Sequence, residues 1–482
     1  MKKKESFIKQ SMQLAIGAIL NLIIGVFTTP LITRLVDPTQ YGELSLFNTY
    51  SSIALMIFSV GLDQTFVRYY YIQEESEYKK KLLKVCLGIP IVFTGIGSII
   101  LMLLHAVNPL LLGFNNIVTV CFIINIFVLV LNRFGMLLVR LEFNTFLYSV
   151  LNVLHKFLYV IIALPLILFF DTDYLFLLII ATIMSLAIPT FICFVNQRKL
   201  LAIKDKDTIL KIDNRELIRF GLPLMVASGV FLVFQAMDKM CIKYYGTYYD
   251  VGVYSSAQSL MAVFAIVQST FNTLWAPKSI QYYENNKEDR SYYVKMNKMI
   301  TIVMFSFGVF VLLFKDIIVL LLGEKYRAAT AIIPFLMFNP IMYTVSETTV
   351  VGLNITKHTK CQMIITGASC LINFIGNMIL IPIMGAKGAA VSTGVSYIVF
   401  FTLRTLFSNH YFPVKYPLLR YYILTGMFAA FALYSIYNSF DIITLLLGVG
   451  ILCSIVVLYR DTIGETCVLV KEIIFKKLKM SK

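Results

Sequence analysis

The sequence predicts an all-α polytopic membrane protein of about fourteen transmembrane helices, with two six-helix lobes followed by two C-terminal helices. The first observation is composition: 59% of the 482 residues are hydrophobic and only 14% are charged, whereas a soluble domain has roughly 25% charged residues. The second is a succession of nearly uncharged runs of about 18 residues or more, each long enough to cross a bilayer. The third is the uneven distribution of Lys and Arg between alternate loops.

The first predicted helix follows a basic N-terminal stretch, MKKKESFIKQ. Because its apolar run continues to Thr33 and no A-x-A cleavage site follows, we interpret it as a retained helix and not as a signal peptide. The predicted helices are Ser11–Thr33, Leu44–Phe66, Val85–Val107, Ile117–Arg133, Phe146–Phe169, Tyr174–Val195, Phe220–Tyr245, Val251–Leu274, Met299–Phe314, Ala328–Val351, Met363–Ile383, Ala386–Phe407, Tyr421–Tyr437 and Ile442–Leu458.

The positive charges fall mainly into alternate loops. If the N-terminus is cytoplasmic, the cytoplasmic segments hold 34 of the 42 Lys and Arg residues, the opposite loops hold 5, and 3 lie within helices. Cytoplasmic loops of membrane proteins are enriched in these residues. We therefore expect both termini to be cytoplasmic, and we attribute the net charge of +16 to topology and not to nucleic-acid binding.

A weak internal repeat with an offset of 210 residues relates the two halves of the chain. The matching positions are Gly42 with Gly252, Leu110–Gly113 with Leu320–Gly323, and Arg68 with Lys278. Six helices per half is an even number, so both halves keep the same orientation around an axis along the membrane normal, with a cavity between them. The expected divisions are an N-terminal lobe (1–195), a basic cytoplasmic linker (196–219), a C-terminal lobe (220–409), and two last helices with a basic tail (410–482).

The sequence contains no recognisable catalytic motif or metal-site spacing. It has no P-loop, no G-x-S-x-G and no H-E-x-x-H, its eight Cys show no C-x-x-C spacing, and its four His are scattered. The predicted outer loops are short, whereas a membrane polymerase or ligase would need a sizeable loop to hold its catalytic residues. We therefore expect a protein that is not an enzyme and that needs no metal or cofactor.

The segment Phe220–Tyr245 is long and apolar enough to span the membrane, yet it carries several polar residues. Gln235, Lys239 and Lys243 recur at a helical spacing of four residues and form one stripe, and Asp238 lies about 100° away from Lys239. Charged side chains at membrane depth are costly and face a partner or an aqueous cavity.

Further polar residues lie within or at the ends of other predicted helices. Residues at helix ends can extend to the lipid headgroups, and buried charges can form ion pairs between helices. The third explanation is that they line an aqueous cavity. The candidate substrate-binding or cavity residues are Lys156, Lys239, Gln235, Asp238, Glu347, Arg34, Arg68 and Arg404.

Three motifs resemble those of the polysaccharide-biosynthesis flippases of the multidrug/oligosaccharidyl-lipid/polysaccharide (MOP) exporter superfamily. They are R-L-x-D-P-x-x-Y-G at Arg34–Gly42, G-L-D-x-x-x-x-R-Y-Y at Gly61–Tyr70, and G-L-P-L…D-K…Y-Y-D-V-G-V-Y-S-S-A at Gly221–Ala257. The resemblance implies a multidrug-and-toxin-extrusion-like fold. It also implies a flippase that moves undecaprenyl-pyrophosphate-linked O-antigen or capsule units to the outer leaflet by alternating access.

The resemblance further implies a monomer in the bacterial cytoplasmic membrane. Its expected partners are the lipid-linked oligosaccharide, membrane lipids, a polysaccharide polymerase and a chain-length regulator. Two alternatives share the fold: a Na⁺- or H⁺-coupled exporter of drugs or metabolites, and a flippase of the lipid II type.

The charged residues suggest a division of roles. Lys156 and Lys239 would contact the pyrophosphate of the cargo, since Lys binds phosphate as a point charge. Asp238 and Glu347 would hold these lysines in the empty state, or accept a coupling proton or sodium ion. The first helix has no charge at the depth of Lys239, so the C-terminal lobe would supply the central cation.

Overall fold

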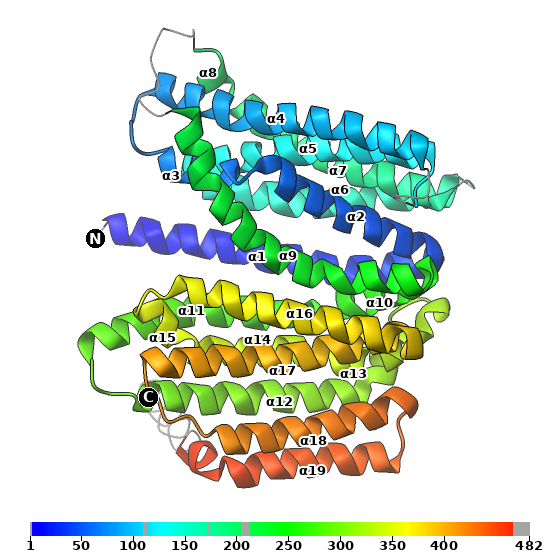
Figure 1. The fold of residues 1–482 in the computed structure, drawn as a ribbon, viewed down its shortest axis with the longest axis vertical. Helices are drawn as coiled ribbons and strands as arrows, with labels where there is room; N and C mark the ends of the chain where they lie inside the picture. Colours follow the sequence, from blue (N-terminus) through cyan, green and yellow to red (C-terminus); the bar gives the residue numbers. More distant parts are fainter. Residues whose placement is uncertain (1, 109–112, 171–172, 204–212, 466–482) are drawn as a thin grey trace, which may run out of the picture. The chain divides into compact units, whose positions relative to one another are not determined.

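The computed structural model describes residues 2–108, 113–170, 173–203 and 213–465, which contain helices and connecting loops and no β-strand. The chain divides into two compact units, Met1–Ala236 and Met237–Lys482, and the helices of each are shown in Figure 1. The predicted lobe limits at 195 and 220 stay predictions. Residues 204–212 of the predicted linker and 466–482 of the predicted tail lie outside the described residues.

Unit 1 contains the first six predicted helices. The start of its second helix explains the D-P pair in the motif Arg34–Gly42. Asp37 caps the second helix by accepting a hydrogen bond from the Thr39 amide at 3.1 Å, and Pro38 occupies the first helical position, where no amide hydrogen is needed. Its helices are α1 (Lys2–Leu35), α2 (Pro38–Ser59), α3 (Leu62–Tyr69), α4 (Ser76–Val107), α5 (Asn116–Leu141), α6 (Thr145–Phe169), α7 (Tyr174–Asn196), α8 (Arg198–Leu201) and the first part of α9 (Asn214–Tyr245).

The second predicted helix, Leu44–Phe66, is broken in the structure into α2 and α3, which meet at an angle of 54°. Val60 and Gly61 separate them, with φ angles of +49° and +70°. A left-handed conformation suits glycine but is rare for a β-branched residue such as valine. The break therefore puts local strain into the backbone directly before the second motif.

Unit 2 continues with α9 and contains several broken helices. The eighth predicted helix is divided between α10 and α11, and the tenth is divided between a 3-10 helix and three α-helices. Its elements are α10 (Tyr248–Met261), α11 (Val263–Asn285), α12 (Ser291–Val319), η1 (Glu324–Ala331), α13 (Ile333–Leu336), α14 (Phe338–Thr349), α15 (Val351–Ile355), α16 (Thr359–Met384), α17 (Ala386–Tyr411), α18 (Leu418–Tyr437) and α19 (Ile442–Leu458).

Aromatic side chains support the break between α14 and α15. The indole of Trp275, the single tryptophan of the chain, donates to the carbonyl of Glu347 at 3.0 Å. The hydroxyl of Tyr416 donates to the carbonyl of Thr348 at 3.1 Å. These are carbonyls near the end of α14, where regular helical hydrogen bonding stops. Both donors come from other parts of unit 2, so the break is fixed by tertiary contacts.

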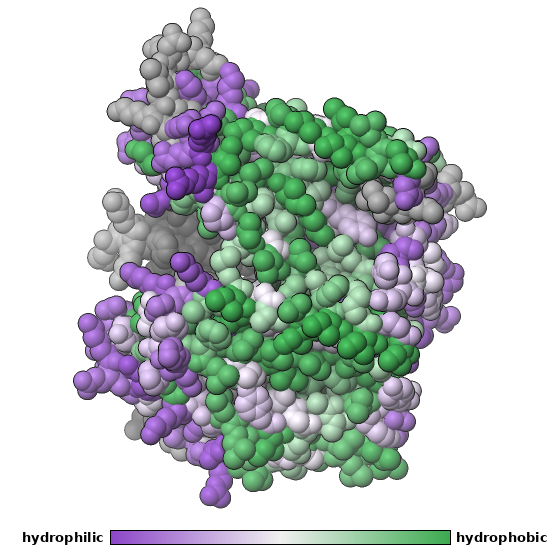
Figure 2. All heavy atoms as spheres, viewed as in Figure 1, coloured by the Kyte–Doolittle hydropathy of each residue, from purple (hydrophilic) through white to green (hydrophobic). Residues whose placement is uncertain are grey.

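The surface of the helices is apolar along their length. Figure 2 shows hydrophobic side chains over the middle of the visible face and hydrophilic ones gathered near the helix ends. Many large apolar residues of the helices are exposed, among them Phe27 at 71%, Leu103 at 62% and Ile383 at 76%. Such a surface is expected of helices that contact lipid.

Among the described residues, ten helices are long and apolar enough to span a membrane, and twelve spans result if each of two bent pairs counts as one. The prediction of an all-helical polytopic membrane protein is therefore confirmed. The estimate of about fourteen spans exceeds this range because α19 is short and the α10–α11 segment is broken. Both segments are nevertheless helical, as predicted.

Candidate functional site

The carboxylate of Asp238 lies in a buried polar cluster of unit 2, in which only 5% of the residue is exposed. Tyr254 of α10 and Thr393 of α17 donate their hydroxyl hydrogens to Oδ2, each at 2.5 Å. Asn373 and Asn377 of α16 donate to Oδ1 at 3.1 and 2.9 Å. We call these five residues the Asp238 cluster.

The sequence places these groups together by helical spacing and by close packing of two helices. Asn373 and Asn377 are four residues apart and therefore share one face of α16. Ser392 of α17 donates to the carbonyl of Asn373 at 2.8 Å, next to Thr393. Small and hydroxylated residues at this contact allow α16 and α17 to approach closely, as is usual between membrane helices.

The Asp238 cluster contains a carboxylate but no neighbouring cation bonded to it. Within the described residues all four donors to Asp238 are neutral, and the Oδ1 atom of Asn377 is buried without a hydrogen-bond partner. An asparagine amide can present either its nitrogen or its oxygen with little change in shape. The cluster can therefore offer several oxygen atoms to a proton or to a hard cation, which prefers oxygen ligands.

No other metal-binding arrangement is present in the part of the chain that the structure describes. No group of three or more His, Cys, Asp and Glu side chains lies close enough there to hold a metal ion. A site for zinc or for a redox metal would need several such ligands.

Glu347 and Arg404, which the sequence offered as separate cavity residues, form a buried ion pair between α14 and α17. The Arg404 Nη1 atom lies 2.9 Å from Glu347 Oε1 and donates to the hydroxyl of Ser346 at 2.6 Å. The guanidinium also lies over the rings of Tyr343 and Phe400, at 5.2 and 4.9 Å from their centroids. The carboxylate of Glu347 is thus bonded to an arginine, and not to either of the predicted lysine partners.

Lys156 and Lys239 have no such partners. Lys156 is exposed on α6, and Lys239 is half-buried on α9. In the described parts of the chain, neither ammonium group makes a hydrogen bond or an ion pair. An unpaired ammonium at membrane depth is costly unless it meets water or an anion.

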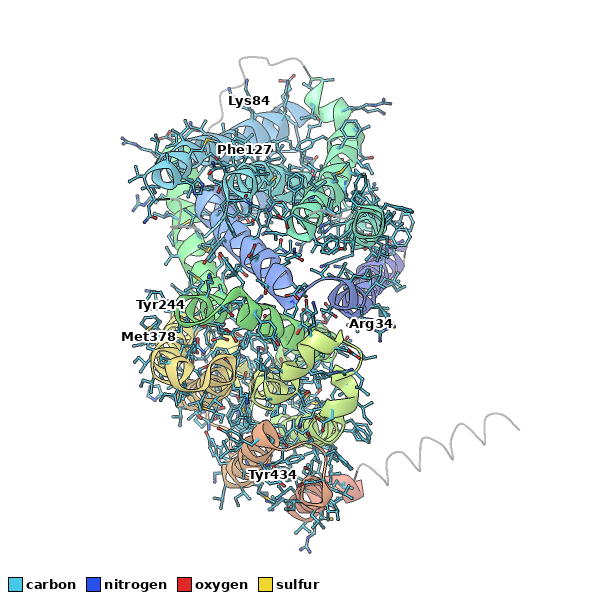
Figure 3. The ribbon with its side chains drawn as sticks, turned by 90° about the vertical axis from the view of Figure 1, so that its right-hand side faces the viewer. Arg34, Lys84, Phe127, Tyr244, Met378 and Tyr434 are labelled. Carbon is cyan, nitrogen blue, oxygen red and sulfur yellow. The ribbon has the colours of Figure 1, made fainter. Side chains whose placement is uncertain are left out.

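The remaining candidates lie at helix surfaces. Gln235 is exposed on α9. Arg68 is exposed in the last turn of α3. Arg34 is exposed in the last turn of α1 and is labelled in Figure 3. The Nζ atom of Lys243, the last member of the predicted stripe, lies 3.7 Å from the centroid of the Tyr248 ring. Gln235, the first member, is exposed instead.

The end of α9 that follows Asp238 is tied to α16. The hydroxyl of Tyr245 lies 3.1 Å from the sulfur of Met378, and Figure 3 labels Met378 together with the adjacent Tyr244. Sequence reasoning concentrated on charges and so did not single out Asn373, Asn377 or Thr393, and Tyr254 appeared only as a member of the third motif. The available signal was the pair of asparagines one helical turn apart in an apolar segment.

Comparison with known proteins gives two kinds of similarity. The sequence model described as "Polysaccharide biosynthesis protein" matches residues 7–278. An uncharacterized membrane protein from Methanocaldococcus jannaschii is 25% identical over 248 residues, which are 49% of this chain and 48% of that protein. The match thus spans about half of that relative.

Solved structures resemble the whole architecture at low sequence identity. The lipid II flippase MurJ in an inward closed conformation has a TM-score of 0.70 at 15% identity, covering 94% of this chain and all of that one. An inward-facing multidrug resistance MATE family transporter gives 0.58 at 15% identity, over 84% and 97% of the two chains. A MOP superfamily transporter from Pyrococcus furiosus gives 0.55 at 14% identity, over 84% and 95%. These similarities establish the fold.

Proposed function

The chain belongs to the polysaccharide biosynthesis protein family, and on this basis we propose that it is a flippase for lipid-linked oligosaccharide units. The cargo would be an oligosaccharide on undecaprenyl pyrophosphate, such as an O-antigen or capsule unit, moved from the cytoplasmic to the outer leaflet by alternating access. Family membership and the fold make the protein a multi-pass membrane transporter. The lipid carrier, the sugar, the bacterial cytoplasmic membrane and the cytoplasmic termini belong to the proposal.

One contrast between the intramembrane charges supports an anionic cargo. The acids Asp238 and Glu347 are each bonded to other side chains, whereas Lys156 and Lys239 are unpaired in the described parts of the chain. Each unpaired ammonium group would attract an anionic group, such as the pyrophosphate diester of the cargo. We assign both lysines to this role, and we give Gln235 and the exposed Arg34 and Arg68 supporting positions along the path.

The Asp238 cluster has a separate role in the proposal. A buried carboxylate surrounded by neutral donors, with an unpartnered amide oxygen beside it, suits the binding of a coupling proton or sodium ion. Binding of such an ion would change the charge of a contact between α9, α10, α16 and α17. We propose that this is how ion binding influences the position of α9.

The direct test is a deletion strain of the source organism. Without the protein, lipid-linked units should accumulate on the cytoplasmic face, and the wild-type chain should restore surface polysaccharide. We expect Lys156→Ala and Lys239→Ala each to reduce restoration while membrane insertion stays normal. Lys156→Arg and Lys239→Arg should retain more function, and the loop variant Lys287→Ala should behave as wild type.

Two results would contradict this function. Normal restoration by both alanine variants would remove the lysines from the substrate path. Efflux of a drug or metabolite that depends on the protein, with unchanged surface polysaccharide in the deletion strain, would instead select the exporter of the same fold.

A further inference from the structure

Two glycines from different motifs meet in unit 1, at the break between α2 and α3. A Cβ atom added to Gly61 would lie 2.0 Å from the carbonyl oxygen of Gly221 in α9, and one added to Gly221 would lie 2.9 Å from the carbonyl carbon and oxygen of Gly61. Such distances leave no room for any side chain. The backbones of the two segments are therefore in direct contact, which only glycine permits.

Polar and aromatic contacts surround this point. The hydroxyl of Thr65, which is fully buried, donates to the carbonyl of Leu217 at 3.1 Å. The hydroxyl of Tyr69 donates to Glu216 at 3.3 Å, and the ring of Tyr69 meets that of Phe220 edge to face at 5.8 Å. Thus the first turns of α9, Glu216 to Gly221, are held by α3 through backbone, hydrogen-bond and ring contacts.

Beyond Gly221 the surroundings of α9 change. The side chains of Leu222, Pro223, Leu224, Val226 and Ser228 are all exposed on unit 1. Pro223 lacks an amide hydrogen and so weakens the helix just past the contact. The helix then passes from unit 1 into unit 2 after Ala236, where Asp238 is held by its four donors. A single helix is therefore held near both ends. The exposed stretch from Leu222 to Ser228 follows the first contact, and Gly229 beyond it lies close to Met56 of α2.

We propose that the Gly61–Gly221 contact is a permanent clamp that makes the first turns of α9 part of unit 1 throughout the transport cycle. Movement of α9 would then be confined to the stretch between Gly221 and Asp238. Gly61 and Gly221 are positioning residues in this view, because they fix the point from which the helix carrying Asp238 moves. The activity assays below rest on the proposed transport function. The measurement of the distance between positions 69 and 216 does not.

A substitution series tests the need for the close approach. We expect Gly221→Ala to lower transport about tenfold, a change of roughly 1.4 kcal/mol in a barrier, although alanine favours a helix more than glycine does. Gly88→Ala and Gly95→Ala are matched controls in α4, because an added Cβ there meets nothing within 4 Å. These controls should transport as wild type. Equal activity of Gly221→Ala and the controls would overturn the proposal.

A reversible cross-link tests whether the clamp stays closed. In a background in which the eight native Cys are replaced, Tyr69→Cys and Glu216→Cys would be joined by a bifunctional thiol reagent that a reductant removes. Each substitution alone, in the same background, would be treated alike. A permanent clamp predicts that the joined protein transports as well as the reduced one, and that joining restores activity to Gly221→Ala. Loss of transport on joining, with recovery on reduction, would show that the contact opens and would overturn the clamp.

Spin labels give a reading that does not depend on any substrate. Labels at positions 69 and 216 should show one narrow distance distribution in lipid, with or without sodium and at low or neutral pH. The distribution should broaden in Gly221→Ala but not in Gly88→Ala. A wild-type distance that shifts with sodium or pH would contradict a permanent clamp. Failure of the wild-type chain to restore polysaccharide would instead count against the proposed function alone.

Discussion

At the level of single residues, the Asp238 carboxylate depends on the donors that face it. Its two oxygens accept hydrogen bonds from Tyr254, Thr393, Asn373 and Asn377. Donor groups buried without an acceptor cost about 1–3 kcal/mol each. A side chain of similar shape that lacks one of the two acceptor oxygens would therefore leave at least one of these donors without an acceptor.

We predict that Asp238→Asn abolishes ion-dependent transport and lowers thermal stability. The new amide nitrogen would face either the amides of α16 or the hydroxyls of Tyr254 and Thr393. In both orientations at least one present donor would lose its acceptor, at a cost of about 1–3 kcal/mol. Transport with and without a sodium or proton gradient, together with melting in detergent, measures both effects. Glu347→Gln is the matched acid-to-amide control, and we expect it to affect stability more than ion dependence, because Glu347 is bonded to Arg404. Unchanged ion dependence in Asp238→Asn would exclude the cluster as the coupling site.

The residues themselves show what the sequence could and could not predict. Asp238 and Lys239 were identifiable as charges in an apolar segment, and Glu347 and Arg404 as further intramembrane charges. Their partners were not, because Asn373 and Thr393 lie 135 and 155 positions away from Asp238. Neutral polar residues also occur in many membrane helices simply as hydrogen-bonding groups between helices. That Arg404 pairs with Glu347 likewise depends on which faces of α14 and α17 meet.

At the level of helices, hydropathy predicted where helices lie but not where they break. The α2–α3 break depends on the left-handed backbone conformation of two residues, Val60 and Gly61. Hydropathy averaged over a long segment contains no information on the conformation of two of its residues. The α14–α15 break lies in a stretch in which Ser346, Glu347, Thr348 and Thr349 are all buried. It depends on donors from elsewhere in unit 2, which local sequence does not reveal.

The α14–α15 break leads to a prediction for the single tryptophan. Trp275→Phe keeps most of the ring packing but removes the donor to the Glu347 carbonyl, which then stays buried without this partner. We expect a loss of about 1–3 kcal/mol in stability, seen as a lower melting temperature and greater proteolysis. Tyr416→Phe removes the equivalent donor to Thr348 and should act in the same direction. Melting temperatures equal to wild type in both variants would show that the carbonyls do not need these donors.

At the level of the whole chain, the predicted repeat of 210 residues does not extend to the buried acid. The residue 210 positions before Asp238 is Thr28, whose hydroxyl donates to its own helix at Ile24. The buried carboxylate and its donors thus belong to the second unit, and the matching position in the first unit is occupied by the neutral Thr28. In the proposed function, ion binding would act through the second half, and unpaired lysines from both halves would attract the cargo.

The charge of the cargo leads to a prediction about membrane potential. Moving one elementary charge across 100 mV changes the free energy by about 2.3 kcal/mol, so two negative charges leaving a negative interior gain roughly twice that amount. We expect outward flipping of a polyprenyl-pyrophosphate oligosaccharide in proteoliposomes to accelerate when the cargo side is negative and to slow when it is positive. Potassium with valinomycin sets the potential, and empty liposomes correct for leakage.

The Asp238→Asn variant separates the two driving forces. If the potential acts on the cargo and the ion gradient acts through the Asp238 cluster, this variant should lose its response to sodium or pH while any residual flipping still responds to potential. A wild-type rate that does not change with potential would mean that compensating cations move with the cargo. In that case the charge moved per cycle is close to zero. Cations that leave with the cargo would also move against an inward sodium or proton gradient, so such a gradient could not drive outward flipping by this route.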